Sequence, residues 1–187
     1  MSADEPNRKF HDVVWPHLAT VLRVARILTG EDAEAEDLAQ DTMLRAFRGI
    51  ESFAPGTDAK AWLLTILRRT RIDRLRSPGT ATDRAVSLEA LEIEPAGETA
   101  ESKSEWERPG EILNAFSDRQ VIEALQMLPE EIRLTLLLVD VEGMDQRDAA
   151  SVLEVPVGTI KSRAHRGRAM LRRALLPMAK EMRFVRE

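Results

Sequence analysis

A segment without helical periodicity, residues 77–117, divides this 187-residue chain into two blocks with helical patterning. It contains Pro-Gly pairs at 78–79 and 109–110, and it holds 9 acidic but only 3 basic side chains. Helix breakers combined with acidic polar residues predict a flexible linker. Neither flank contains a run that alternates with period two, so the sequence predicts an all-α protein of two small helical domains, residues 1–76 and 118–187.

The formal net charge of −5 arises in this linker. Residues 1–76 carry 12 basic and 12 acidic side chains, and residues 118–187 carry 12 basic and 11 acidic ones. The overall acidity of the chain therefore does not exclude nucleic-acid binding by either flank.

Several function classes are excluded by composition. The chain has no cysteine, which rules out disulfides, thiol catalysis and cysteine-ligated metal. Its first residues lack the basic start, apolar core and cleavage site of an export signal. The apolar run Leu134–Val139 is far shorter than the roughly 20 residues that a membrane span needs. We therefore expect a cytoplasmic protein with no membrane insertion.

The first block predicts three or four helices. Apolar residues at helical spacing from Phe10 to Leu28 indicate a helix that Pro16 divides and Gly30 ends. A second helix is expected from about Glu31 to Phe53, with an acidic first turn that suits the helix dipole. Asp58 is then a candidate N-cap for a third helix that reaches about Arg76.

The second block ends in a predicted helix-turn-helix. Ser117 is a candidate N-cap for its first helix, and Pro129 fits the first turn of the next one, which stops near Gly143. A short helix over residues 145–153, a tight turn at 154–156 and a long basic helix from Val157 follow. This arrangement is typical of a helix-turn-helix motif.

The last helix is the strongest candidate for DNA binding. Its apolar residues Ile160, Ala164, Gly167, Leu171 and Leu175 fall within a stripe of about 80°, and no acid lies between Val157 and Leu176. With its N-terminal end in a major groove, the helix would direct four side chains to base edges: Lys161, Ser162, Arg163 and Arg166. Thr159 and Arg168 would meet phosphates. The alternative is an ordinary solvated basic face.

Two helices of the first block carry opposite charge. The helix that begins near Asp58 is apolar at first and then carries five arginines opposed only by Asp73, which suits a nucleic-acid backbone or, alternatively, its own dipole. In the acidic helix, Glu34, Asp37 and Asp41 share one face. Because that face would repel phosphate, it favours a protein partner over DNA; simple solvation is the alternative.

Several long motifs of the chain resemble those of a known protein family. Four stretches resemble conserved region 2 of the extracytoplasmic-function (ECF) sigma factors of the sigma-70 family: Leu22–Gly30, Ala35–Phe47, Ala61–Arg68 and Ile72–Arg76. Two more, Ala124–Arg133 and Val155–Arg163, are similar to the start and the recognition helix of region 4. The resemblance covers about residues 10–76 and 118–176, in the family's order.

The resemblance implies a bacterial transcription-initiation subunit. Its region 2 domain, residues 1–76, would bind the clamp helices of the largest core RNA polymerase subunit through Asp37, Gln40 and Asp41. The same domain would open and read the −10 promoter element through the loop before the basic helix and through that helix: Asp58, Lys60, Trp62, Arg68, Arg69, Arg71, Arg74 and Arg76.

The resemblance assigns the second domain, residues 118–187, to region 4. This domain would read the −35 promoter element with its recognition helix and contact the flap of the second largest polymerase subunit. The linker would run near the RNA exit path. An anti-sigma factor is an expected partner and would clamp between the two domains.

The sequence departs from the family pattern at three positions. Glu154 stands in the helix-turn-helix turn where many relatives have glycine, at a cost of roughly 1 kcal/mol if its φ is positive. Gly167 stands where alanine would be commoner in a helix, at a similar cost. Asp58 replaces a frequent asparagine in the −10 loop, which puts its contact to a base in doubt.

Catalysis has little support in the sequence. The histidines His11, His17 and His165 lack the spacing of metal ligands, and the nine glycines are scattered rather than gathered in a phosphate loop. We expect no cofactor and no enzymatic activity. Two rival functions remain: a plain helix-turn-helix regulator, and a sigma-like decoy that binds an anti-sigma factor.

Overall fold

The computed structural model describes residues 4–76 and 118–181. Within these ranges all regular structure is helical, which confirms the all-α prediction. The predicted linker at 77–117 and the predicted N-cap at Ser117 lie outside the described residues.

The N-terminal helical group consists of α1 (Asp4–Val13), η1 (Trp15–His17), α2 (Leu18–Thr29), α3 (Asp32–Gly49), η2 (Ile50–Ser52) and α4 (Ala59–Arg76). Pro16 lies in the short 3-10 turn η1, so it divides α1 from α2 as predicted. Gly30 adopts φ 84° and ends α2, its N–H donating to the carbonyl of Arg26. The helices pack around buried aliphatic side chains that include Val21, Leu38 and Leu64.

The C-terminal helical group consists of α6 (Asp118–Gln126), α7 (Glu130–Leu136), the π-helical segment η5 (Leu137–Val141), α8 (Gln146–Leu153) and α9 (Val157–Glu181). Pro129 lies at the N-cap of α7, one residue before the first turn in which the sequence placed it. In η5 the backbone widens, and the N–H of Glu142 donates to the carbonyl of Leu137 at 2.8 Å.

The predicted apolar stripe of α9 is buried along its described length. For Gly167 the sequence predicted only the cost of placing glycine in a helix, but the structure also shows a packing role. A Cβ added there would lie 2.7 Å from Ile132 Cγ2 and 2.9 Å from Leu136 Cγ. Glycine is therefore the residue that lets α9 approach α7 closely, and alanine would collide with the core.

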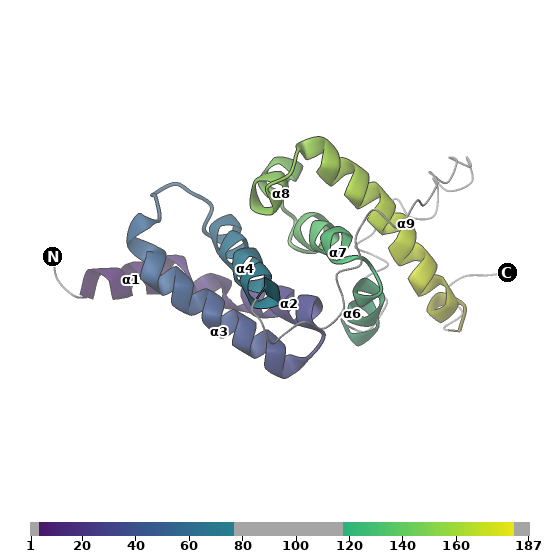
Figure 1. Ribbon diagram of the computed structural model, residues 1–187, viewed down its shortest axis with the longest axis horizontal. Coiled ribbons are helices and arrows are strands. Elements are labelled where there is room, and N and C mark those ends of the chain that lie inside the picture. Colours follow the sequence, from purple (N-terminus) through teal and green to yellow (C-terminus); the bar gives the residue numbers. More distant parts are fainter. Residues whose placement is uncertain (1–3, 77–117, 182–187) are drawn as a thin grey trace.

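The two helical groups pack against each other, with α4 against α8 and α2 against α6 and α7 (Figure 1). Their buried residues form one hydrophobic cluster. Arg133 of α7 reaches across and donates to the carbonyl oxygen of Leu28, at the C-terminal end of α2, at 3.3 Å. A guanidinium suits this position because the last carbonyls of a helix carry partial negative charge.

Candidate nucleic-acid interfaces

The helix-turn-helix is built by local caps on α8. Asp145 Oδ1 accepts hydrogen bonds from the backbone N–H groups of Arg147 at 2.6 Å and Asp148 at 2.9 Å. These bonds favour the carboxylate and lower the pKa of Asp145. At its other end α8 stops at Glu154 in the left-handed conformation, with φ 56° and ψ 42°. The short helix, tight turn and following helix confirm the predicted motif.

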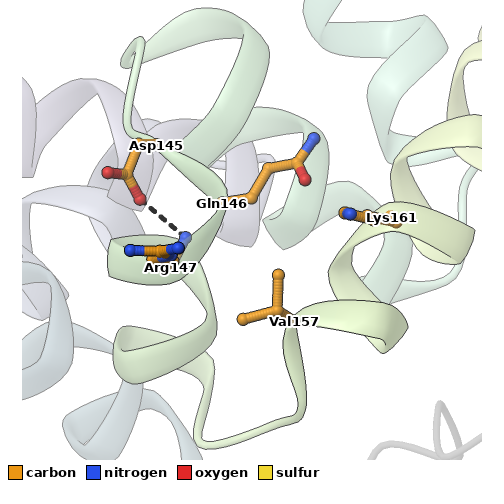
Figure 2. Close-up of a pocket in the computed structure, with 5 residues that line it drawn as sticks. All are labelled: Asp145, Gln146, Arg147, Val157 and Lys161. Atoms are coloured by element: carbon orange, nitrogen blue, oxygen red, sulfur yellow. Dashed lines mark hydrogen bonds between the residues drawn. The ribbon is translucent and has the colours of Figure 1, made fainter.

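An open hollow of about 340 Å³ lies between the N-terminal end of α8 and the N-terminal end of α9. Figure 2 shows its five lining residues, Asp145, Gln146, Arg147, Val157 and Lys161, with the polar side chains of both helices around it. Of these five residues, only Lys161 was predicted from the sequence to contact DNA. Gln146 and Arg147 could also have been found from the sequence, because they directly follow Asp145, the N-cap of the first helix of the motif.

The six residues predicted to meet −35 DNA fall into two groups. Lys161, Ser162 and Arg166 are exposed and Thr159 is half-buried near the N-terminal end of α9. Arg163 instead binds the carboxylate of Glu131 on α7, and Arg168 donates to Asp140 Oδ1 at 2.7 Å. The hydrogen bonds to Asp140 raise the pKa of Arg168.

The start of α4 is fixed by Asp58, as the sequence predicted. Asp58 Oδ1 accepts from the N–H groups of Lys60 at 2.8 Å and Ala61 at 3.3 Å. Trp62 is half-buried and packs against Phe53, with 5.1 Å between ring centroids. Lys60 extends to the C-terminal group, where its Nζ donates to the carbonyl oxygen of Glu142 at 2.8 Å.

The arginines of α4 meet more acids than the sequence indicated. Arg69 Nη2 lies 2.7 Å from Glu154 Oε1, and Arg68 Nη1 lies 3.0 Å from Glu154 Oε2. The hydrogen bonds and charges of these two guanidiniums lower the pKa of Glu154. Arg71 Nη2 lies 3.9 Å from Glu130 Oε2. Arg76 is exposed at the end of the helix.

Arg74 faces the acidic helix. Its Nε lies 3.0 Å from Asp41 Oδ2, and its Nη2 donates to the backbone carbonyl of Asp37 at 2.8 Å. Asp41 is therefore paired with the neighbouring helix, whereas Asp37 and Gln40 are exposed.

Two apolar side chains border this acidic face of α3. Leu44 is 47% exposed and Phe47 is 41% exposed. Leu44 follows Gln40 and Asp41 at helical spacing, so it lies on the same face. Charged and apolar groups side by side are typical of a protein-binding surface. The exposure of Leu44 and Phe47 could not be predicted from sequence, because it depends on how α3 packs.

Within the described residues, no group of three or more His, Asp or Glu side chains could hold a metal ion. No helix in the part of the chain that the structure describes is long and apolar enough to span a membrane.

These observations define the class: a helical protein in which a helix-turn-helix group is docked on a second group that carries one acidic and one basic helix. Comparison with known proteins narrows it. The family model for Sigma-70 region 2 matches residues 14–80, and that for Sigma-70, region 4 matches residues 118–171. The chain belongs to the ECF sigma factors of the sigma-70 family.

Similar relatives cover both groups of helices. The ECF RNA polymerase sigma factor EcfG of Rhodopseudomonas palustris is 38% identical over 77% of this chain and 72% of its own length. The ECF RNA polymerase sigma factor SigE of Mycolicibacterium smegmatis is 33% identical over 86% of this chain, which spans only 59% of that relative.

A solved structure has a similar arrangement of helices. It holds the sigma factor RpoE in complex with the anti-sigma factor NepR from Bartonella quintana, and it matches with a TM-score of 0.68 and 30% identity. The match covers 89% of this chain and 96% of that one.

Proposed function

We propose that this sigma factor binds core RNA polymerase, recognises −35 and −10 promoter elements and promotes DNA melting for transcription initiation. One observation carries the proposal. A single chain that matches both sigma regions has two basic helices, α4 and α9, and one acidic, partly apolar helix, α3. We assign residues 1–76 to the −10 and polymerase-binding domain, 77–117 to the linker and 118–187 to the −35-binding domain.

The −35 element would be read from the N-terminal end of α9. Lys161, Ser162 and Arg166 are exposed there, and the hollow beside them contains Gln146 and Arg147 of α8. Lysine, arginine and glutamine are side chains that read base edges in the major groove. Arg163 and Arg168 would contact DNA after exchanging an acidic partner for a phosphate, because a guanidinium binds either anion.

The −10 element would be opened by the loop before α4 and by α4 itself. This surface combines a half-buried tryptophan, Trp62, with the arginine series that begins at Arg68. Aromatic rings stack on unpaired bases and cations follow the backbone, so the combination suits single-stranded DNA. Because the carboxylate of Asp58 is used as a helix cap, we expect it to hold the loop in place.

Core polymerase would bind α3 through Asp37, Gln40 and Asp41. The exposed Leu44 lies on the same face, and Phe47 borders it. We propose that this face meets the clamp helices of the largest polymerase subunit. The C-terminal group would contact the flap of the second largest subunit.

An anti-sigma factor is the second proposed partner. The sigma factor RpoE of Bartonella quintana, which shares 30% of its sequence with this chain, is solved in complex with one. Polymerase would perform the chemistry, so we propose that this chain is not an enzyme, needs no cofactor and acts in the cytoplasm.

The test is run-off transcription with purified core polymerase and a pool of randomised promoters, with and without the protein. We expect protein-dependent transcripts that share two upstream motifs. Lys161→Ala should change the −35 motif, whereas Arg173→Ala, farther along the same helix, serves as the matched control. Polymerase binding without transcripts would favour the decoy, and no polymerase binding would favour the plain helix-turn-helix regulator.

A further inference from the structure

The acids that meet the arginines of α4 come partly from the other helical group. Glu154 lies in the turn of the helix-turn-helix, and Glu130 begins α7. Both face guanidiniums that the proposed function assigns to −10 DNA, Glu154 at Arg68 and Arg69 and Glu130 at Arg71. In the packed arrangement these guanidiniums therefore face carboxylates, which are anions of the kind that DNA phosphates would replace.

We propose that Glu154 is an autoinhibitory residue that holds the two groups together in the free protein and masks the −10-binding arginines. The inference rests on the proposed function, because masking has meaning only if α4 binds DNA. The "Glu154 contact" below means the Glu154 carboxylate with the guanidiniums of Arg68 and Arg69.

The geometry of the Glu154 contact is that of a bridge. One carboxylate oxygen faces each guanidinium, at 2.7 Å for Arg69 and 3.0 Å for Arg68. The side chain of Arg69 is 64% exposed, so a competing phosphate has access to it. Charge-assisted contacts of this kind are stronger than neutral hydrogen bonds, yet an exposed pair is readily exchanged.

The backbone at Glu154 gives a second, independent reason. Glu154 is the one non-glycine residue with positive φ in the part of the chain that the structure describes. Glycine adopts this conformation without steric cost, whereas a side chain strains it. Local folding of the turn therefore favours glycine at this position. Glutamate differs from glycine in supplying the carboxylate that binds Arg68 and Arg69.

Other contacts keep the two groups in register for this bridge. Glu142, at the end of η5, has a side chain only 4% exposed and accepts from Arg23 Nε at 2.9 Å and Nη2 at 3.1 Å. Its backbone oxygen also accepts from Lys60 at 2.8 Å. A nearly buried carboxylate paired with Arg23, next to a backbone carbonyl that binds Lys60, marks a formed interface rather than a chance surface contact.

Glu154 and −10 DNA would therefore compete for the same arginines of α4. A protein that reads two promoter elements needs its −10 arginines free, and in the packed arrangement an acid from the −35 domain neutralises them. Polymerase binding that separates the groups would remove Glu154 from α4 and supply the effective concentration for both DNA contacts.

The test measures the separation of the groups in the full chain without polymerase or DNA. Because the protein has no cysteine, spin labels can be placed at Glu51→Cys and Arg173→Cys, both exposed, and their distance distribution recorded by pulsed EPR. We expect Glu154→Gly, which keeps the turn conformation, to shift the distribution to longer distances. Glu154→Gln removes only the charge and should shift it in the same direction.

Glu123→Gln is the matched control, because it removes an equal charge from an ion pair within α6, where Glu123 binds Arg119. It should leave the distribution unchanged. A distribution that stays short in both Glu154 variants overturns the proposal, even if the wild type supports transcription. Run-off transcription by the wild type is measured separately. An absence of transcripts would count against the proposed function, whereas the distance distributions test only the Glu154 contact.

Discussion

The guanidinium of Arg74 on α4 binds the carboxylate of Asp41 on α3, with 3.0 Å between Nε and Oδ2. The pair joins a residue assigned to −10 DNA to a residue assigned to polymerase. Because Arg74 also donates to the backbone carbonyl of Asp37, it fixes the acidic face of α3 relative to the basic helix. The two proposed binding surfaces of this domain are therefore held in one rigid unit.

This pair gives a first prediction. Asp41→Asn should weaken binding of core polymerase by about 1 kcal/mol, roughly fivefold in Kd, because the face loses a charge and the ion pair between Asp41 and Arg74. Titration of labelled core polymerase measures the change. Glu51→Gln, an exposed acid outside α3, is the control. Equal affinity for wild type and Asp41→Asn would remove this residue from the polymerase surface.

Gly167 gives a second prediction. Gly167→Ala should destabilise the fold by about 1–3 kcal/mol, because the new methyl group enters space occupied by Ile132 and Leu136. Urea unfolding followed by circular dichroism measures the free energy. The control is Gly158→Ala, where an added Cβ meets nothing within 4 Å. Gly167→Ala should be the less stable of the two; the reverse order would contradict the packing described.

A third prediction concerns base readout by α9. Lys161→Ala or Arg166→Ala should cost about 1–3 kcal/mol on the preferred −35 sequence and relax the preference at one position. Competition between promoter variants in transcription by the reconstituted polymerase measures both quantities. If each substitution weakens all sequences equally, these two residues contact only phosphate.

The fourth prediction concerns acid stability. Backbone hydrogen bonds from Asp148 and Arg147 lower the pKa of Asp145 from its ordinary value of 3.8. A depressed pKa contributes stability above the unfolded value and loses it as the pH falls through the folded one, so the loss lies below about pH 4. Asp145→Asn keeps a capping oxygen but does not titrate.

The measurement is urea unfolding at about pH 6 and about pH 3, for the wild type and Asp145→Asn. The wild type should lose more of its unfolding free energy between the two pH values than the variant does. An equal loss in both proteins would mean that the cap does not titrate in this range.

Local features of the fold could be predicted from sequence. Pro16, Gly30 and Asp58 act where they stand, through a fixed φ, a left-handed backbone and a capping oxygen, so the positions of these helix boundaries follow from short segments. The apolar stripe of α9 was equally visible, because helical spacing alone decides which side chains share a face.

Contacts between the helical groups could not be predicted in the same way. Arg69 and Glu154 are 85 residues apart in sequence, and Arg23 and Glu142 are 119 apart. No local pattern fixes such pairs, since they depend on how one group docks on the other. The role of Gly167 was missed for a similar reason: its neighbours Ile132 and Leu136 belong to another helix.

The most direct test of the central claim is to map the transcripts that core polymerase makes from randomised DNA only when this protein is present. We predict start sites preceded by two sequence motifs at a fixed spacing, one for each basic helix. Start sites that share a single motif, or none, would contradict the claim.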